Sequence, residues 1–255
     1  MAKKSRAQSR ETRKDRNAFA QVKLSERWYG RQLRKIANHV GDLVDGLYGD
    51  NDDAIQAIIR ALEAYAEAIT PWAKAQAKRM LVEVSRRDKR AWDRFAKTMG
   101  VELRREIEET PLGAAFQAMV TEQVALITSL PLEAAQRVQK LSIEALSSGV
   151  RSRVLAADIL ATGEVTRSRA TLIARTEVAR AASKLTQARA EYIGSPGYIW
   201  TAVKDAATRK SHREMDGQYV EWSKPPTLSD GYTTHAGQIF NCRCVAQPVL
   251  PQDLR

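Results

Sequence analysis

Apolar residues that recur every three or four positions constrain this chain more than any other feature of its sequence. A first stripe contains Ile36, Val40, Leu43, Val44 and Leu47, and a second contains Ile55, Ile58, Ile59, Leu62, Tyr65 and Ile69. This spacing places the apolar side chains on one face of an α-helix. The stripes therefore predict a succession of amphipathic helices separated by short breaks.

Thr-Pro dipeptides and glycines mark the expected helix boundaries. A threonine N-cap followed by a first-turn proline predicts helix starts at Thr70-Pro71 and Thr110-Pro111. Pro131 is expected to open another helix, and Gly163 is expected to separate the last two. After the second stripe, the predicted helices cover 70–100, a segment from 111, 131–149, 150–161 and 167–193.

After Gly194 the composition changes to aromatic and β-branched residues. Strands are predicted at 198–203, 218–222 and 242–246, with turn-forming residues between them. We predict an α+β fold that is mostly helical, with an elongated helical N-terminal body and a small irregular β-containing C-terminal module. The predicted domains are a basic N-terminal arm (1–35), a helical region (36–165) and a C-terminal module with its long leading helix (166–255).

Positive charge is concentrated at the N-terminus. The chain carries 41 Lys and Arg against 30 Asp and Glu, and residues 1–35 hold twelve basic and three acidic residues. Such an arm can bind nucleic acid by neutralising phosphates, or it can be a solvated tail. The candidate nucleic-acid-binding residues are Lys3, Lys4, Arg6, Arg10, Arg13, Lys14 and Arg16.

No segment indicates a membrane role or export. Apolar runs fall short of the ~20 residues that a transmembrane helix needs, and the N-terminus lacks the apolar core of a signal peptide. Cys242 and Cys244 are too few and too close together to form a disulfide framework.

Four polar residues in the C-terminal module have helical spacing. They are Asp205, Arg209, His212 and Asp216, and a helix through 206–215 would present all four on one face. Asp205 would cap that helix, and Gly217 would follow its end. The four residues could form an acid–base site or a salt-bridge network that stabilises a small core. We favour the structural interpretation, because no nucleophile is evident.

Glu177 interrupts the apolar stripe of the helix predicted at 167–193. It follows Ala174 by three residues and precedes Ala181 by four. A buried carboxylate must be paired, because an unpaired buried charge is very costly. Arg209 and Arg243 are the expected partners, unless this edge of the stripe is exposed.

The two cysteines suggest a metal site. On a strand, Cys242 and Cys244 would point to the same face. Together with His212 and His235 they would make a set of two Cys and two His suited to zinc. The alternative is two reduced, partly buried thiols. No other cofactor is expected.

These residues occur in an order that resembles a known family. The ordered set is Arg175-Thr176-Glu177, Trp200, Asp205, Arg209, His212, Asp216-Gly217, Gly237 and Asn241-Cys242-Arg243-Cys244. It resembles the phage Mu protein F-like family, also called phage head morphogenesis or minor head proteins. The resemblance covers residues 150–250, and its separate motifs are individually unspecific.

The resemblance implies a minor head protein of a tailed bacteriophage. Such a protein is present in few copies at the portal vertex and is linked to head morphogenesis and DNA packaging or delivery. It would locate to the virion, in the capsid interior or at the portal vertex, and to the host cytoplasm during assembly. The implied partners are the portal protein, a major capsid or scaffold protein, and genomic DNA through the arm.

The alternatives are an enzyme or a plain DNA-binding module. Some relatives are fused to toxin or ADP-ribosyltransferase domains, but we expect no room for one in a chain that ends at Arg255. A nuclease-like hydrolase or an ADP-ribosyltransferase could use Arg175, Glu177 and His212. Clustered carboxylates for two metals and a glycine-rich phosphate loop are not evident, so we expect no enzymatic activity. A plain DNA-binding module would leave the ordered C-terminal motif unexplained.

Overall fold

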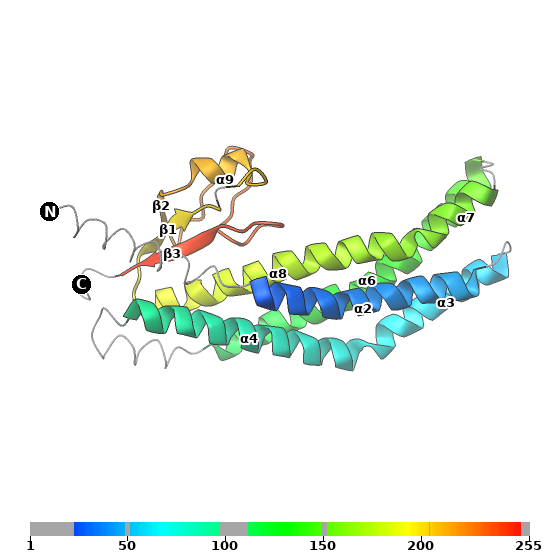
Figure 1. Ribbon diagram of the computed structural model, residues 1–255, viewed down its shortest axis with the longest axis horizontal. Helices are drawn as coiled ribbons and strands as arrows, with labels where there is room; N and C mark the ends of the chain where they lie inside the picture. Colours follow the sequence, from blue (N-terminus) through cyan, green and yellow to red (C-terminus); the bar gives the residue numbers. More distant parts are fainter. Residues whose placement is uncertain (1–22, 49–51, 97–111, 149–151, 204, 251–255) are drawn as a thin grey trace. The chain divides into compact units, whose positions relative to one another are not determined.

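The computed structural model describes residues 23–48, 52–96, 112–148, 152–203 and 205–250, and Figure 1 shows its elements. The helices are α2 (Lys23–Leu47), α3 (Asp52–Ala68), α4 (Thr70–Ala96), α6 (Gly113–Ser148), α7 (Ser152–Leu160), α8 (Thr162–Tyr192) and α9 (Lys210–Glu214). The strands are β1 (Gly197–Thr201), β2 (Tyr219–Glu221) and β3 (Val245–Val249). The predicted mostly helical α+β class is confirmed.

The chain divides into two compact units. The first, called here the helical unit, contains residues 27–79 and 118–174. The second, the C-terminal unit, has its described residues at 23–26, 80–96, 112–117, 175–203 and 205–250. Within the described ranges, no helix is long and apolar enough to cross a membrane.

Apolar stripes from several helices form the core of the helical unit. Its fully buried side chains include Tyr29, Leu33, Val40, Val44, Ile58, Leu62, Ile127 and Val138. Two glycines allow α2 and α8 to approach each other closely. A Cβ atom added to Gly163 would lie 2.9 Å from the Cα of Gly41.

The assignment of residues 23–35 to a basic arm was wrong. These residues belong to α2, and Tyr29 and Leu33 are fully buried in the helical unit. Residues 23–35 contain few apolar side chains, and these alternate with basic ones, so the sequence showed no clear helical stripe there. The seven candidate nucleic-acid-binding residues, from Lys3 to Arg16, lie outside the described residues.

Two predicted helix boundaries were also wrong. Pro131 lies inside α6 instead of opening a new helix. Ile127 and Leu130 before the proline and Val138 after it are all buried, so one continuous apolar face favours an uninterrupted helix. The break between α7 and α8 falls at Ala161, and Gly163 lies in the first turn of α8, where it packs against Gly41.

The sheet of the C-terminal unit has three antiparallel strands in the order β2-β1-β3 (Figure 1). The first two predicted strands are confirmed, but the third was placed three residues too early. Thr201, the last residue of β1, pairs with Val245, so the ladder ends there. Cys242 and Cys244 consequently lie in the loop that precedes β3.

Aromatic residues dominate the core of the C-terminal unit. Trp92 of α4, Tyr198 and Trp200 of β1, and Trp222 after β2 are buried in one cluster that also contains both cysteines. The rings of Tyr198 and Trp222 have centroids 4.5 Å apart. Of the residues that the sequence singled out, Trp200, Cys242 and Cys244 belong to this cluster.

Candidate functional site

A compact cluster of one histidine and two cysteines lies in the core of the C-terminal unit. The His212 Nδ1 atom is 3.5 Å from Cys242 Sγ and 3.4 Å from Cys244 Sγ. All three side chains are buried, and their possible ligand atoms lie within 4.8 Å of one another. Both cysteines are free thiols.

Local backbone geometry positions the two cysteines. Asn241 adopts a left-handed conformation with φ 56°, and its N–H donates to Thr176 Oγ1 of α8 at 3.1 Å. The N–H of Cys242 donates to the carbonyl of Ile239 at 3.1 Å. The N–H of Cys244 then donates to Cys242 Sγ at 3.4 Å. The loop is therefore a tight turn that brings both sulfur atoms to one side.

His212 comes from α9, thirty residues before Cys242. Its ring meets the ring of Trp200 edge to face, with centroids 5.6 Å apart. The neighbouring Ser211 hydroxyl donates to Asp230 at 2.7 Å and fixes the start of the helix. His212 Nε2 is buried and makes no hydrogen bond within the described part of the chain.

The two neighbouring thiols shift each other's pKa in opposite directions. The hydrogen bond from Cys244, assisted by His212, lowers the pKa of Cys242 against the opposing effect of burial. The same hydrogen bond and burial raise the pKa of Cys244. The two shifts have opposite directions, so Cys242 is the more acidic of the two thiols.

His235 does not join the cluster, so the predicted set of two Cys and two His is corrected to three residues. The His235 Nδ1 atom lies 3.1 Å from the Tyr198 hydroxyl instead. Its ring packs edge to face against Tyr198 and Trp222. Sequence composition could not distinguish a histidine among aromatic rings from one beside sulfur.

The predicted polar face of Asp205, Arg209, His212 and Asp216 does not form. The helix spans only Lys210–Glu214, and its N-cap is Arg209, without a capping side-chain hydrogen bond. Asp216 accepts a hydrogen bond from the N–H of Ala202 at 2.9 Å. The predicted role of Gly217 after the helix fits its φ of 84°.

Asp205 and Arg209 contact different partners around the cysteine loop. Asp205 accepts two hydrogen bonds from Arg243, at 2.5 and 2.8 Å, and the pair holds the pKa of Asp205 below its usual value. The Arg209 guanidinium lies 4.5 Å from the centre of the Phe240 ring and donates to the Phe240 carbonyl at 3.1 Å. Both residues brace the loop from outside.

Glu177 is buried, as expected, but its ion pair is with neither of the expected arginines. Its Oε1 lies 3.0 Å from Nη1 of Arg180, one helical turn further along α8. Arg180 also donates to the carbonyl of Gln238 at 3.0 Å. The i, i+3 spacing of Glu177 and Arg180 was a sequence signal that could have predicted this pair.

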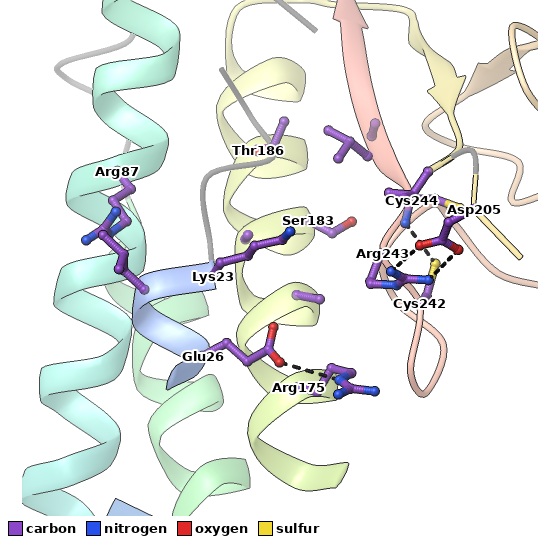
Figure 2. Close-up of a pocket in the computed structure, with 16 residues that line it drawn as sticks. Lys23, Glu26, Arg87, Arg175, Ser183, Thr186, Asp205, Cys242, Arg243 and Cys244 are labelled. Carbon is purple, nitrogen blue, oxygen red and sulfur yellow. Dashed lines mark hydrogen bonds and ion pairs between the residues drawn. The ribbon is translucent and has the colours of Figure 1, made fainter. Parts of the chain in front are cut away.

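A cavity of about 680 Å³ adjoins the cysteines (Figure 2). Its charged lining residues are Lys23, Glu26, Arg87, Arg175, Asp205 and Arg243. Arg175 pairs with Glu26 at 3.4 Å across 149 positions of sequence. Lys23, Glu26 and Arg87 were not predicted as site residues, because no local pattern connects them with the C-terminal module.

Together, the fold and the site define a small aromatic-rich α+β module that follows a long helix and carries a buried Cys-x-Cys loop facing a histidine. Residues 136–247 match the family model described as Phage Mu protein F like protein. The resemblance inferred from the ordered motif is confirmed over this segment, and it connects the segment with phage head-related proteins.

One curated relative is similar along nearly the whole chain. It is described as an uncharacterized protein of Haemophilus influenzae (strain ATCC 51907 / DSM 11121 / KW20 / Rd), and it is 31% identical over 254 residues. The alignment covers 91% of this chain and 55% of the relative, so the chain spans about half of that protein's length. No solved structure gives a significant match.

Proposed function

We propose that this chain is a minor head protein of a tailed bacteriophage that acts at the portal vertex in head morphogenesis and in DNA packaging or delivery. The family match over residues 136–247 carries the proposal, because that family is phage head-related. The location is the virion, in the capsid interior or at the portal vertex, with a passage through the host cytoplasm during assembly.

The proposed partners are other head components and the genome. The portal protein and a major capsid or scaffold protein would contact the folded part of the chain. The basic residues between Lys3 and Arg16 would neutralise phosphates of genomic DNA.

The proposed role is structural and not enzymatic. The charged residues of the ordered motif are engaged in bracing the module: Asp205 with Arg243, Glu177 with Arg180, and Asp216 with the Ala202 backbone. Groups held in such pairs are poorly placed to transfer protons to a substrate. An ADP-ribosyltransferase or nuclease activity of purified heads that disappears with this chain would favour the enzymatic alternative.

The test is the composition of phage particles. Heads purified from a phage that produces an epitope-tagged copy of this chain should contain it at far lower copy number than the major capsid protein. Heads assembled without the portal protein should lack it, while their major capsid protein is unchanged. Absence of the chain from purified heads would overturn the proposal, and its retention in portal-less heads would remove the portal from the list of partners.

A further inference from the structure

The cluster of His212, Cys242 and Cys244 has the donor atoms and spacing of a metal site. We propose that these three residues bind a zinc ion that ties α9 to the loop before β3. Two sulfur atoms and one imidazole nitrogen form a borderline-soft donor set, which suits zinc better than the oxygen-preferring magnesium or calcium. This inference is independent of the proposed role in the phage head.

The distances agree with tetrahedral coordination. Zinc bonds are about 2.3 Å long to sulfur and about 2.0–2.1 Å long to nitrogen. At a tetrahedral angle, these lengths place a sulfur ligand and a nitrogen ligand about 3.5–3.6 Å apart. The observed separations of His212 Nδ1 from the two sulfur atoms are 3.5 and 3.4 Å. Both nitrogen–sulfur separations therefore fit one ion bound to His212 and to the two cysteines.

A metal also explains an imidazole that is otherwise poorly satisfied. His212 is buried, its Nε2 makes no hydrogen bond within the described residues, and its Nδ1 faces only sulfur. A single ring proton on Nδ1 cannot form a good hydrogen bond to both sulfur atoms. Burying an imidazole with so few partners is costly, and a bond to zinc would offset that cost.

The surroundings favour thiolate ligands. The N–H of Cys244 donates to Cys242 Sγ, which stabilises negative charge on that sulfur. The left-handed Asn241 and the Thr176 contact hold the loop in the conformation that aligns the sulfurs. The Trp200 ring packs against the His212 ring with centroids 5.6 Å apart and so helps to hold the imidazole in place.

Three ligands from the described residues leave one tetrahedral position. Cys242 and Cys244 both line the cavity of about 680 Å³, so a water molecule from that cavity can occupy the position. The ion would cross-link segments that are thirty or more residues apart in a module with a small core. Zinc binding should therefore contribute to the folding of the module.

The experiment measures zinc in the 255-residue chain. The chain purified without chelators should contain about one zinc per molecule by plasma mass spectrometry. After chelation, added Co²⁺ should give the intense visible bands of a tetrahedral site and a near-ultraviolet sulfur-to-cobalt band. Cys242→Ser, Cys244→Ser and His212→Asn should each lose the metal, while the matched control His235→Asn should retain it.

A second measurement on the wild-type chain guards against variants that fail to fold. In the presence of enough denaturant to expose buried thiols, both cysteines should react more slowly with a thiol-specific reagent when Zn²⁺ is present than when chelator is present. A wild-type chain that is free of zinc and binds neither Zn²⁺ nor Co²⁺ would overturn the proposal. Undiminished metal binding by a folded Cys242→Ser variant would also overturn it.

Discussion

Asp88 of α4 forms an ion pair with Arg189 of α8 inside the C-terminal unit, where both side chains are buried. The Thr186 hydroxyl donates to the same carboxylate at 2.5 Å, and Arg189 also donates to Ser85 at 3.2 Å. Burial raises the pKa of Asp88 to about 6, and the neighbouring Arg189 guanidinium opposes that rise. Asp88 and Arg189 are 101 positions apart in sequence, so their pair connects two distant helices.

Removing this carboxylate should destabilise the C-terminal unit strongly. Asp88→Ala leaves the Arg189 guanidinium buried without its counter-charge, which costs about 3–5 kcal/mol. Chemical denaturation at neutral pH measures the change in free energy of unfolding. The matched control is Glu83→Ala on the same helix, whose pairs with Arg86 and Arg87 are partly exposed and contribute about 0–1 kcal/mol. Equal losses in the two variants would contradict this interpretation.

Gly163 should not tolerate a side chain. The Cβ of Gly163→Ala would lie 2.9 Å from the Cα of Gly41, so α2 and α8 would have to separate. Such overpacking costs about 1–3 kcal/mol. Gly46→Ala is the control, because a Cβ at Gly46 meets nothing within 4 Å and alanine favours the helix by about 0.5–1 kcal/mol. Thermal unfolding should therefore shift in opposite directions, and a neutral Gly163→Ala would disprove the close approach.

The Asp205–Arg243 pair should make stability depend on acid pH. Because the hydrogen bonds from Arg243 lower the pKa of Asp205 in the folded chain, its stabilising effect is complete above the unfolded value of 3.8. The effect is lost as the pH falls through the lowered value. Asp205→Asn should lack this part of the acid dependence in a pH series of denaturation curves. If Asp205→Asn and the wild type show the same acid dependence, that dependence comes from other carboxylates.

Two truncations should distinguish the role of the basic terminus from that of the folded residues that follow it. Deleting residues 1–16 removes seven basic and two acidic residues and stops before α2 begins at Lys23. DNA affinity should fall, and the slope of log affinity against log salt should shrink by about 0.9 for each lost phosphate contact. Titration of duplex DNA at several salt concentrations measures both, and unchanged binding would assign these residues to another partner.

The longer deletion of residues 1–35 should unfold the helical unit, because it removes the fully buried Tyr29 and Leu33. Loss of one large buried side chain alone costs about 2–5 kcal/mol. Circular dichroism should show native helix content for the shorter truncation and a large loss for the longer one. A fully helical product of the longer deletion would mean that the core does not need residues 23–35.

The sequence by itself determined the elements whose signals are local. Apolar spacing predicted the stripes of α2 and α3, and Thr70-Pro71 predicted the start of α4. Aromatic and β-branched content predicted the first two strands. These features depend on interactions within about four residues, which a sequence displays directly. The order of the C-terminal motif residues along the chain was also sufficient to indicate the phage Mu protein F-like family.

Tertiary structure decided the partners of the polar residues. The sequence placed four polar residues on one helix face, but only five residues of that segment are helical and the four side chains contact different neighbours. Glu26 meets Arg175, Asp88 meets Arg189, and His212 meets the cysteines while His235 meets Tyr198. Such pairs form because packing brings distant segments together and buried charges and polar groups must then find partners, a constraint that residue spacing along the chain does not encode.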